Sequence, residues 1–82
     1  EGSFQVLYWD DDLLVYQRVL GEKRIIVTAS RVDQPYGFIL KSDLINPDGL
    51  ERLTSLFGDA TLVLHPGELK IPAMPRGGAI WL

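Results

Sequence analysis

Apolar residues occur along this chain in short runs that are separated by turn-forming residues. Val, Ile, Leu and aromatic side chains make up the runs, and Gly, Pro, Asp and Asn stand between them. β-branched and aromatic side chains favour an extended backbone, and the residues between the runs allow the chain to reverse. The pattern predicts an all-β domain of about eight antiparallel strands, either a β-sandwich with Greek-key connections or a barrel. We expect the sandwich.

The first part of the chain contains three strands that fold back on one another. They are expected at residues 4–8, 13–20 and 24–31, with turns at Asp10–Asp12 and at Gly21-Glu22. The third strand carries an unbroken run of β-branched residues, Ile25 to Thr28, which favours extended backbone. A continuous apolar run indicates a strand that is covered on both faces or lies at the centre of a sheet.

The later part of the chain contains four further strands. A weaker one is expected at residues 36–41, where Gly37 interrupts the pattern. A Pro66-Gly67 turn joins two clearer strands, and a third closes the chain. These three strands are expected at residues 61–65, 68–71 and 77–82.

The segment around residues 48–58 allows two interpretations. Asp48 followed by Glu51 fits a capping box, and Leu50, Leu53 and Phe57 recur at helical spacing before Gly58. The same segment also fits a strand at residues 52–56. Local rules favour the short helix.

Alternation within the strands assigns one face of each strand to the core. The residues that we expect in the core are Phe4, Val6, Leu14, Tyr16, Ile25, Val27, Ile39, Leu62, Leu64, Leu69, Ile71 and Ile80.

Composition narrows the classes of protein that remain. The chain has 82 residues, enough for one domain, and a formal net charge of −3 with its eight Lys and Arg scattered. Nucleic-acid binding usually needs a basic stripe, so we expect no such partner. Without cysteine there is no disulfide or thiolate zinc site. No apolar run reaches the roughly 20 residues of a membrane span, and the N-terminus does not resemble a signal peptide. We expect a soluble protein, cytoplasmic or secreted, that does not contact membranes.

No set of residues suggests catalysis. The one histidine, His65, stands at a strand end without a second acid–base group linked to it. The run Asp10–Asp12 lacks the spacing of a helix-loop-helix calcium site and reads as a solvated turn. Gly77 and Gly78 precede no helix, so a phosphate cradle is not expected. We therefore predict no catalytic residue, no metal site and no cofactor.

Aromatic residues are the remaining candidates for function. Tyr8 and Trp9 lead into the acidic turn that starts at Asp10, and Trp81 lies near the C-terminus. An aromatic ring stacks on sugars and a nearby carboxylate accepts hydrogen bonds from hydroxyl groups. Neighbouring residues of a strand point to opposite faces, so at most one of Tyr8 and Trp9 is expected in the core. If Tyr8 packs with Val6, Trp9 faces outward, where it binds sugar, covers another domain or is merely tolerated.

The order of these features resembles a known domain. The matching residues at the start are Gly2-Ser3-Phe4, Asp10–Asp12, Val15-Tyr16 with Arg18, Gly21-Glu22-Lys23 and Ile25–Val27; the end, "LTSLFGD…GELKIPAMPRGGAIWL", matches too. Together they resemble the C-terminal β-sandwich domain of alpha-amylase-family glycoside hydrolases, most closely the cyclomaltodextrinase, neopullulanase and alpha-glucosidase branches. The chain departs from that pattern at Ala29-Ser30, where the family usually has Asn.

The resemblance implies that residues 1–82 are one domain of a larger glycosidase. The family's catalytic groups lie on a (β/α)₈ barrel, which needs about 250 residues, so no catalytic residue carries over. The resemblance also favours a strand at residues 52–56, and we expect the strand there.

These features lead to one expected function and two alternatives. We expect an accessory domain that docks on the catalytic barrel and stabilises it, using Tyr8, Trp9, Asp10 or Trp81 as contacts. One alternative is a module that binds alpha-glucan through the same residues, and the other is an unrelated small interaction domain.

Overall fold

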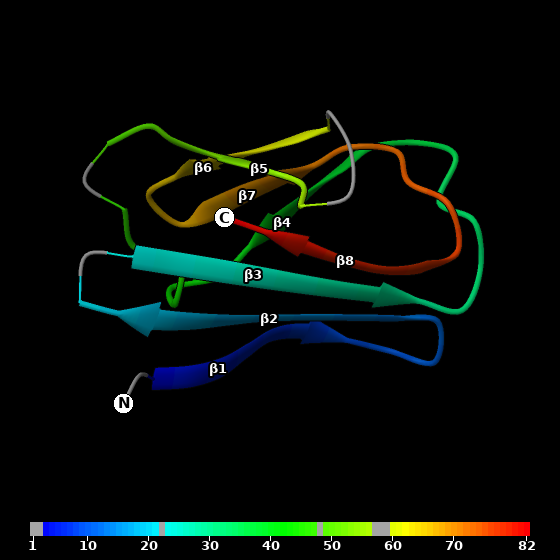
Figure 1. Cartoon of the computed structure of the whole chain (residues 1–82), viewed down its shortest axis with the longest axis horizontal. Helices are drawn as coiled ribbons and strands as arrows, with labels where there is room; N and C mark the ends of the chain where they lie inside the picture. The colour runs from blue at the N-terminus through cyan, green and yellow to red at the C-terminus, as the bar shows by residue number, and fades with distance from the viewer. Residues whose placement is uncertain (1–2, 22, 48, 57–59) are drawn as a thin grey trace.

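Two antiparallel sheets of four strands each form the fold (Figure 1). The computed structural model describes residues 3–21, 23–47, 49–56 and 60–82, and for residues 3 and 4 the backbone alone. The strands are β1 (Ser3–Trp9), β2 (Leu13–Leu20), β3 (Lys23–Ser30), β4 (Phe38–Lys41), β5 (Glu51–Thr54), β6 (Thr61–His65), β7 (Glu68–Ile71) and β8 (Gly77–Trp81). The described residues contain no helix. The predicted all-β sandwich is confirmed, and the predicted strands differ from these only at their ends.

The order of the strands within the sheets is β1-β2-β3-β8 and β4-β7-β6-β5. In the second sheet β5, β6 and β7 follow one another as a meander, and β4 lies beside β7, which is a Greek-key arrangement. Gly67, in the turn between β6 and β7, has a φ of 81°, a backbone conformation that residues with a Cβ rarely adopt. The Pro-Gly turn expected from the sequence is therefore present.

Backbone hydrogen bonds join the two sheets along the side of the sandwich where β5 and β8 meet. Thr54 and Leu82 exchange N–H···O bonds of 3.0 and 3.1 Å, and the Leu56 N–H donates to the Ile80 carbonyl at 2.8 Å. These bonds join the end of β5 to β8. On the opposite side β1 and β4 are the outermost strands, and each pairs with a single neighbouring strand in the part of the chain that is described.

A β-bulge interrupts β1. Val6 is paired with Tyr16 and Tyr8 with Val15, so Leu7 is an extra residue on β1. Tyr8 therefore shares a face with the buried Val15, and Trp9 shares a face with Leu14, which is paired with it.

The core lies between the sheets. Its buried hydrophobic residues are Leu7, Leu13, Val15, Ile26, Leu40, Ile45, Leu53, Leu62, Leu64, Leu69, Ile71 and Trp81. For β6 and β7 the predicted core is confirmed, since Leu62, Leu64, Leu69 and Ile71 are all buried.

The predicted core face is wrong for the first sheet and for β4. Val6, Leu14 and Ile39 are exposed. Tyr16, Ile25, Val27 and Ile80 are half-buried, and their neighbours are buried in their place. The physical reason is that these strands carry apolar residues on both faces, so alternation does not tell which face is inside. The side chain of Phe4 lies outside the described part.

The ambiguous segment forms a strand, as the resemblance predicted. β5 pairs with β6 over its whole length, from Glu51 opposite Leu64 to Thr54 opposite Thr61. Leu53 is buried against the core whereas Leu50 is about half exposed. The pairing with β6 overrides the local helical spacing. Asp48, Phe57 and Gly58, which the helical interpretation used, lie outside the described residues.

Candidate functional site

The structure does not bring the four predicted contact residues together. Trp81 is buried, with an exposed fraction of 1%, and its indole N–H donates to Thr28 Oγ1 at 3.2 Å. It stands opposite Ile26 in the sheet, within the core. The expectation that Trp81 contacts a ligand or another domain is therefore corrected: it presents no ring surface.

Tyr8 and Asp10 form one unit at the end of β1. The Tyr8 hydroxyl donates to Asp10 Oδ2 at 2.5 Å. Asp10 Oδ1 accepts from the backbone N–H groups of Asp12 and Leu13, each at 2.8 Å. The Asp10 carboxylate thus stabilises the turn into β2 in the manner of an Asx turn. This is the acidic turn that the sequence predicted.

These hydrogen bonds set the protonation of the pair. The bond from Tyr8, followed by those from the two backbone N–H groups, lowers the pKa of Asp10. The same bond to Asp10 raises the pKa of Tyr8 above its ordinary value, with smaller effects from burial and from the negative charge. At neutral pH the arrangement is a neutral phenol that donates to a carboxylate.

Trp9 points to the other side of the strand. It is paired with Leu14 and is 72% exposed. The bulge at Leu7 shifts by one residue the alternation of side chains between the two faces of β1. Trp9 therefore lies on the same face as Val6, and Tyr8 lies on the opposite face.

Trp9 belongs to an apolar surface that extends across the outward face of the first sheet. In cross-strand register, Val6, Tyr16, Val27 and Ile80 form a row over β1, β2, β3 and β8. Trp9 and Leu14 form the next row. We call this surface the outer apolar face, and its apolar members are Val6, Trp9, Leu14, Tyr16, Ile25, Val27 and Ile80. Two exposed charged residues, Arg18 and Lys23, lie on the same side of the sheet.

The outward face of the second sheet is different in character. Along each strand its side chains alternate with the buried residues, which are Leu40, Leu53, Leu62, Leu64 and Leu69. Its members are Ile39, Lys41, Arg52, Thr54, Thr61, Val63, His65, Glu68 and Lys70. Charged and hydroxyl side chains dominate it, as is usual for a sheet face in contact with water. The two outward faces of the same sandwich therefore differ in polarity.

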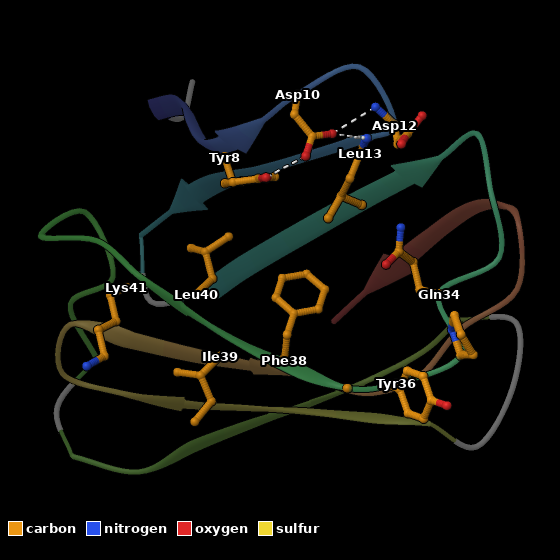
Figure 2. A pocket seen from close by; sticks show the side chains of 12 residues that line it. Tyr8, Asp10, Asp12, Leu13, Gln34, Tyr36, Phe38, Ile39, Leu40 and Lys41 are labelled. Carbon is orange, nitrogen blue, oxygen red and sulfur yellow. Dashed lines mark hydrogen bonds between the residues drawn. The ribbon is translucent and has the colours of Figure 1, made fainter.

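A groove lies on the open side of the sandwich, between β1 and β4. Figure 2 shows the side chains that line it. Its volume is about 660 Å³. Leu13, Phe38 and Leu40 form its apolar floor, and Tyr8 and Tyr36 line it as well. Sequence reasoning found Tyr8 and missed Tyr36, because nothing in the sequence showed that residue 36 lies near the end of β1.

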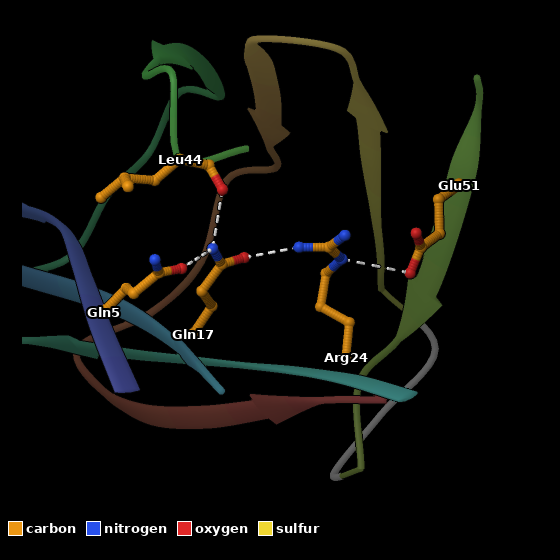
Figure 3. Close-up of polar contacts among 5 residues, drawn as sticks. All are labelled: Gln5, Gln17, Arg24, Leu44 and Glu51. Atoms are coloured by element: carbon orange, nitrogen blue, oxygen red, sulfur yellow. Dashed lines mark hydrogen bonds and ion pairs between the residues drawn. The ribbon is translucent and has the colours of Figure 1, made fainter. Parts of the chain in front are cut away.

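A series of polar contacts, centred on the buried side chain of Gln17, lies in another part of the sandwich (Figure 3). Gln17, 1% exposed, donates from Nε2 to Gln5 Oε1 at 2.7 Å and to the Leu44 carbonyl at 2.8 Å. Its Oε1 accepts from Arg24 Nη1 at 2.7 Å. Arg24 Nε lies 3.4 Å from Glu51 Oε2, a charge contact without hydrogen-bond geometry. These contacts tie the first sheet to the loop before β5 through Leu44 and to β5 itself through Glu51, which is a structural role.

The other polar candidates do not form a catalytic arrangement. His65 is exposed at the end of β6, paired across the hairpin with Glu68. Among the residues that the structure describes, no group of three His, Asp or Glu side chains is placed to hold a metal ion. No helix among them is long and apolar enough to cross a membrane.

Comparisons of the chain with protein-family models, with curated proteins and with solved structures find no match.

Proposed function

We propose that this chain is a non-catalytic accessory domain of an alpha-amylase-family glycoside hydrolase and that it packs on the catalytic barrel through the outer apolar face. The outer apolar face supports this proposal. Large apolar patches on a soluble domain are usually covered by a partner, and this one contains a tryptophan that is 72% exposed.

The contrast between the two sheets strengthens the argument. A sandwich that is surrounded by water needs two polar outward faces, and the second sheet has one. The first sheet instead has half-buried Tyr16, Val27 and Ile80 where polar side chains would be expected. The unbroken apolar run of β3 is the sequence signature of a strand covered on both sides.

The resemblance indicates the partner. In the alpha-amylase family the domain that this sequence resembles follows a (β/α)₈ barrel, so the proposed occupant of the outer apolar face is the surface of that barrel. The catalytic carboxylates belong to the barrel in this proposal, and the present domain contributes stability. An interface of this kind buries roughly 600–1,500 Å².

The proposal is tested with a pair of matched substitutions in the full-length protein. Val27 and Val63 are both half-buried valines on central strands, Val27 on the outer apolar face and Val63 on the polar face. Val27→Glu is expected to lower the melting temperature of the catalytic domain by several degrees, whereas Val63→Glu leaves it unchanged. Both variants of the isolated chain are expected to give the amide spectrum of a folded β-domain.

Three results would overturn the proposal. One is a full-length coding sequence without a barrel, and another is an equal effect of the two substitutions on the catalytic domain. The third is a dimer of the isolated chain that forms at micromolar concentration and is dissociated by Val27→Glu, because the face would then serve a second copy.

A further inference from the structure

The groove between β1 and β4 is a second surface with features of a ligand site. Small-molecule sites are concave, mostly apolar and supplied with a few convergent polar groups. This groove has an apolar floor of Leu13, Phe38 and Leu40, and its volume of about 660 Å³ lies in the usual range. It is built from both sheets, because Leu13 belongs to β2, and Phe38 and Leu40 belong to β4.

Two tyrosines supply aromatic surface to the groove. Figure 2 shows Tyr8 and Tyr36 on opposite sides of Phe38. Tyr36 is 82% exposed, so its ring lies open to a ligand. The Tyr8 ring is held in place by its hydroxyl bond to Asp10. A ring that is fixed before binding loses less conformational entropy when a ligand stacks on it.

Polar groups with free hydrogen-bonding capacity line the same groove. The Asp12 carboxylate, the Gln34 side-chain oxygen and the Lys41 ammonium group make no hydrogen bond or ion pair with another described residue. The Tyr8 hydroxyl donates its hydrogen to Asp10, so its oxygen is left to accept a hydrogen bond from a hydroxyl group of a ligand. Carboxylate, amide and phenol oxygens are suited to accept hydrogen bonds from several hydroxyl groups at once.

We propose that this groove binds a neutral oligosaccharide, with pyranose rings stacked on Tyr8 and Tyr36. A pyranose ring has an apolar C–H face and a rim of hydroxyl groups, which matches aromatic rings beside oxygen acceptors. Asp10 and Asp12 at the groove disfavour an anionic sugar by charge repulsion. The proposal does not depend on docking, because the groove lies on the inward side of β1 and Trp9 lies on its outward side.

The site is tested by titrating the isolated chain with maltoheptaose and, separately, with cellohexaose, while the backbone amide shifts are followed. The expected shifts cluster at Tyr8, Leu13 and residues 36–41, with a Kd on the order of 1 mM for at least one of the two sugars. Tyr36→Ala is expected to weaken binding roughly tenfold or more. Its exposed position means that the substitution leaves folding intact.

Trp9→Ala is the matched control, because it removes an exposed aromatic ring from the other side of the same strand. Binding to this variant should equal binding to the parent chain. Shifts that cluster at Trp9 and Leu14 and vanish in Trp9→Ala would contradict the proposal. So would the absence of shifts with both sugars at concentrations about tenfold above that Kd, or tighter binding of oligogalacturonate. None of these results affects the Val27→Glu test of docking.

Discussion

The bond between Trp81 and Thr28 offers a direct test of the core described above. Thr28 is fully buried and Trp81 is 1% exposed, and the indole N–H donates to Thr28 Oγ1 at 3.2 Å. Thr28→Val replaces the hydroxyl by a methyl group of similar size and leaves the indole N–H without its acceptor. This substitution changes one polar contact and almost no volume.

The size of the expected change in the free energy of unfolding follows from the burial of the indole N–H and of the Thr28 hydroxyl. A buried donor left unsatisfied costs about 1–3 kcal/mol, and the added methyl group returns at most about 0.8 kcal/mol. We expect Thr28→Val to lower the free energy of unfolding by about 1–2 kcal/mol. For a domain of this size each kcal/mol corresponds to about 4–8 °C in melting temperature.

The assay is urea denaturation followed by circular dichroism, with Trp81→Phe and the double variant completing a cycle. Once the indole N–H is gone, the loss of the hydroxyl has little cost, so the double variant should be about 1 kcal/mol more stable than the sum of the single effects predicts. Thr61→Val, at an exposed position of β6, is the control and should stay within about 0.5 kcal/mol of the parent chain. Additive effects in the cycle, or no loss in Thr28→Val, would refute the hydrogen bond between Trp81 and Thr28.

Two further predictions concern the polar contacts. Arg24→Met leaves Gln17 Oε1 without its donor in a buried position, so we expect a loss of about 1–3 kcal/mol in urea denaturation, and Arg24→Lys should recover only part of it. A full recovery by lysine would contradict the role assigned to the guanidinium group. Because the folded state lowers the pKa of Asp10, its contribution to stability is present above the ordinary value of 3.8 and is lost as the pH falls through the folded pKa. The melting temperature should therefore fall more steeply below about pH 4 in the parent chain than in Asp10→Asn, and equal slopes would count against the bonds to Asp10.

Strand positions could be predicted from the sequence because the turns are local. The Pro66-Gly67 corner and the acidic turn at Asp10–Asp12 each depend on residues that are adjacent in the chain. Asp10 caps its own turn, and Gly67 adopts a positive φ. Properties of this kind belong to the residue types themselves and need no knowledge of the tertiary structure.

The faces of the strands could not be predicted in the same way. In β3 both Ile26 and Val27 are apolar, so the alternation is equally consistent with either as the core residue. Which one is buried depends on the sheet that packs against β3, a property of the tertiary structure. Ile45 shows the same limit, because it is buried from a loop in which no strand pattern marks it.

The sequence placed Trp9 outward on the assumption that Val6 and Tyr8 both face the core, and the bulge at Leu7 is the reason that Trp9 faces outward although Val6 is exposed. Plain alternation from Val6 would put Tyr8 outward and Trp9 inward. The extra residue reverses both assignments, so that Trp9 joins the outer apolar face and Tyr8 faces the groove. A single inserted residue thus gives each aromatic ring a different surface. A domain docked on the outward side of β1 therefore covers Trp9 and leaves Tyr8 open to a ligand, which makes docking and sugar binding compatible in one protein.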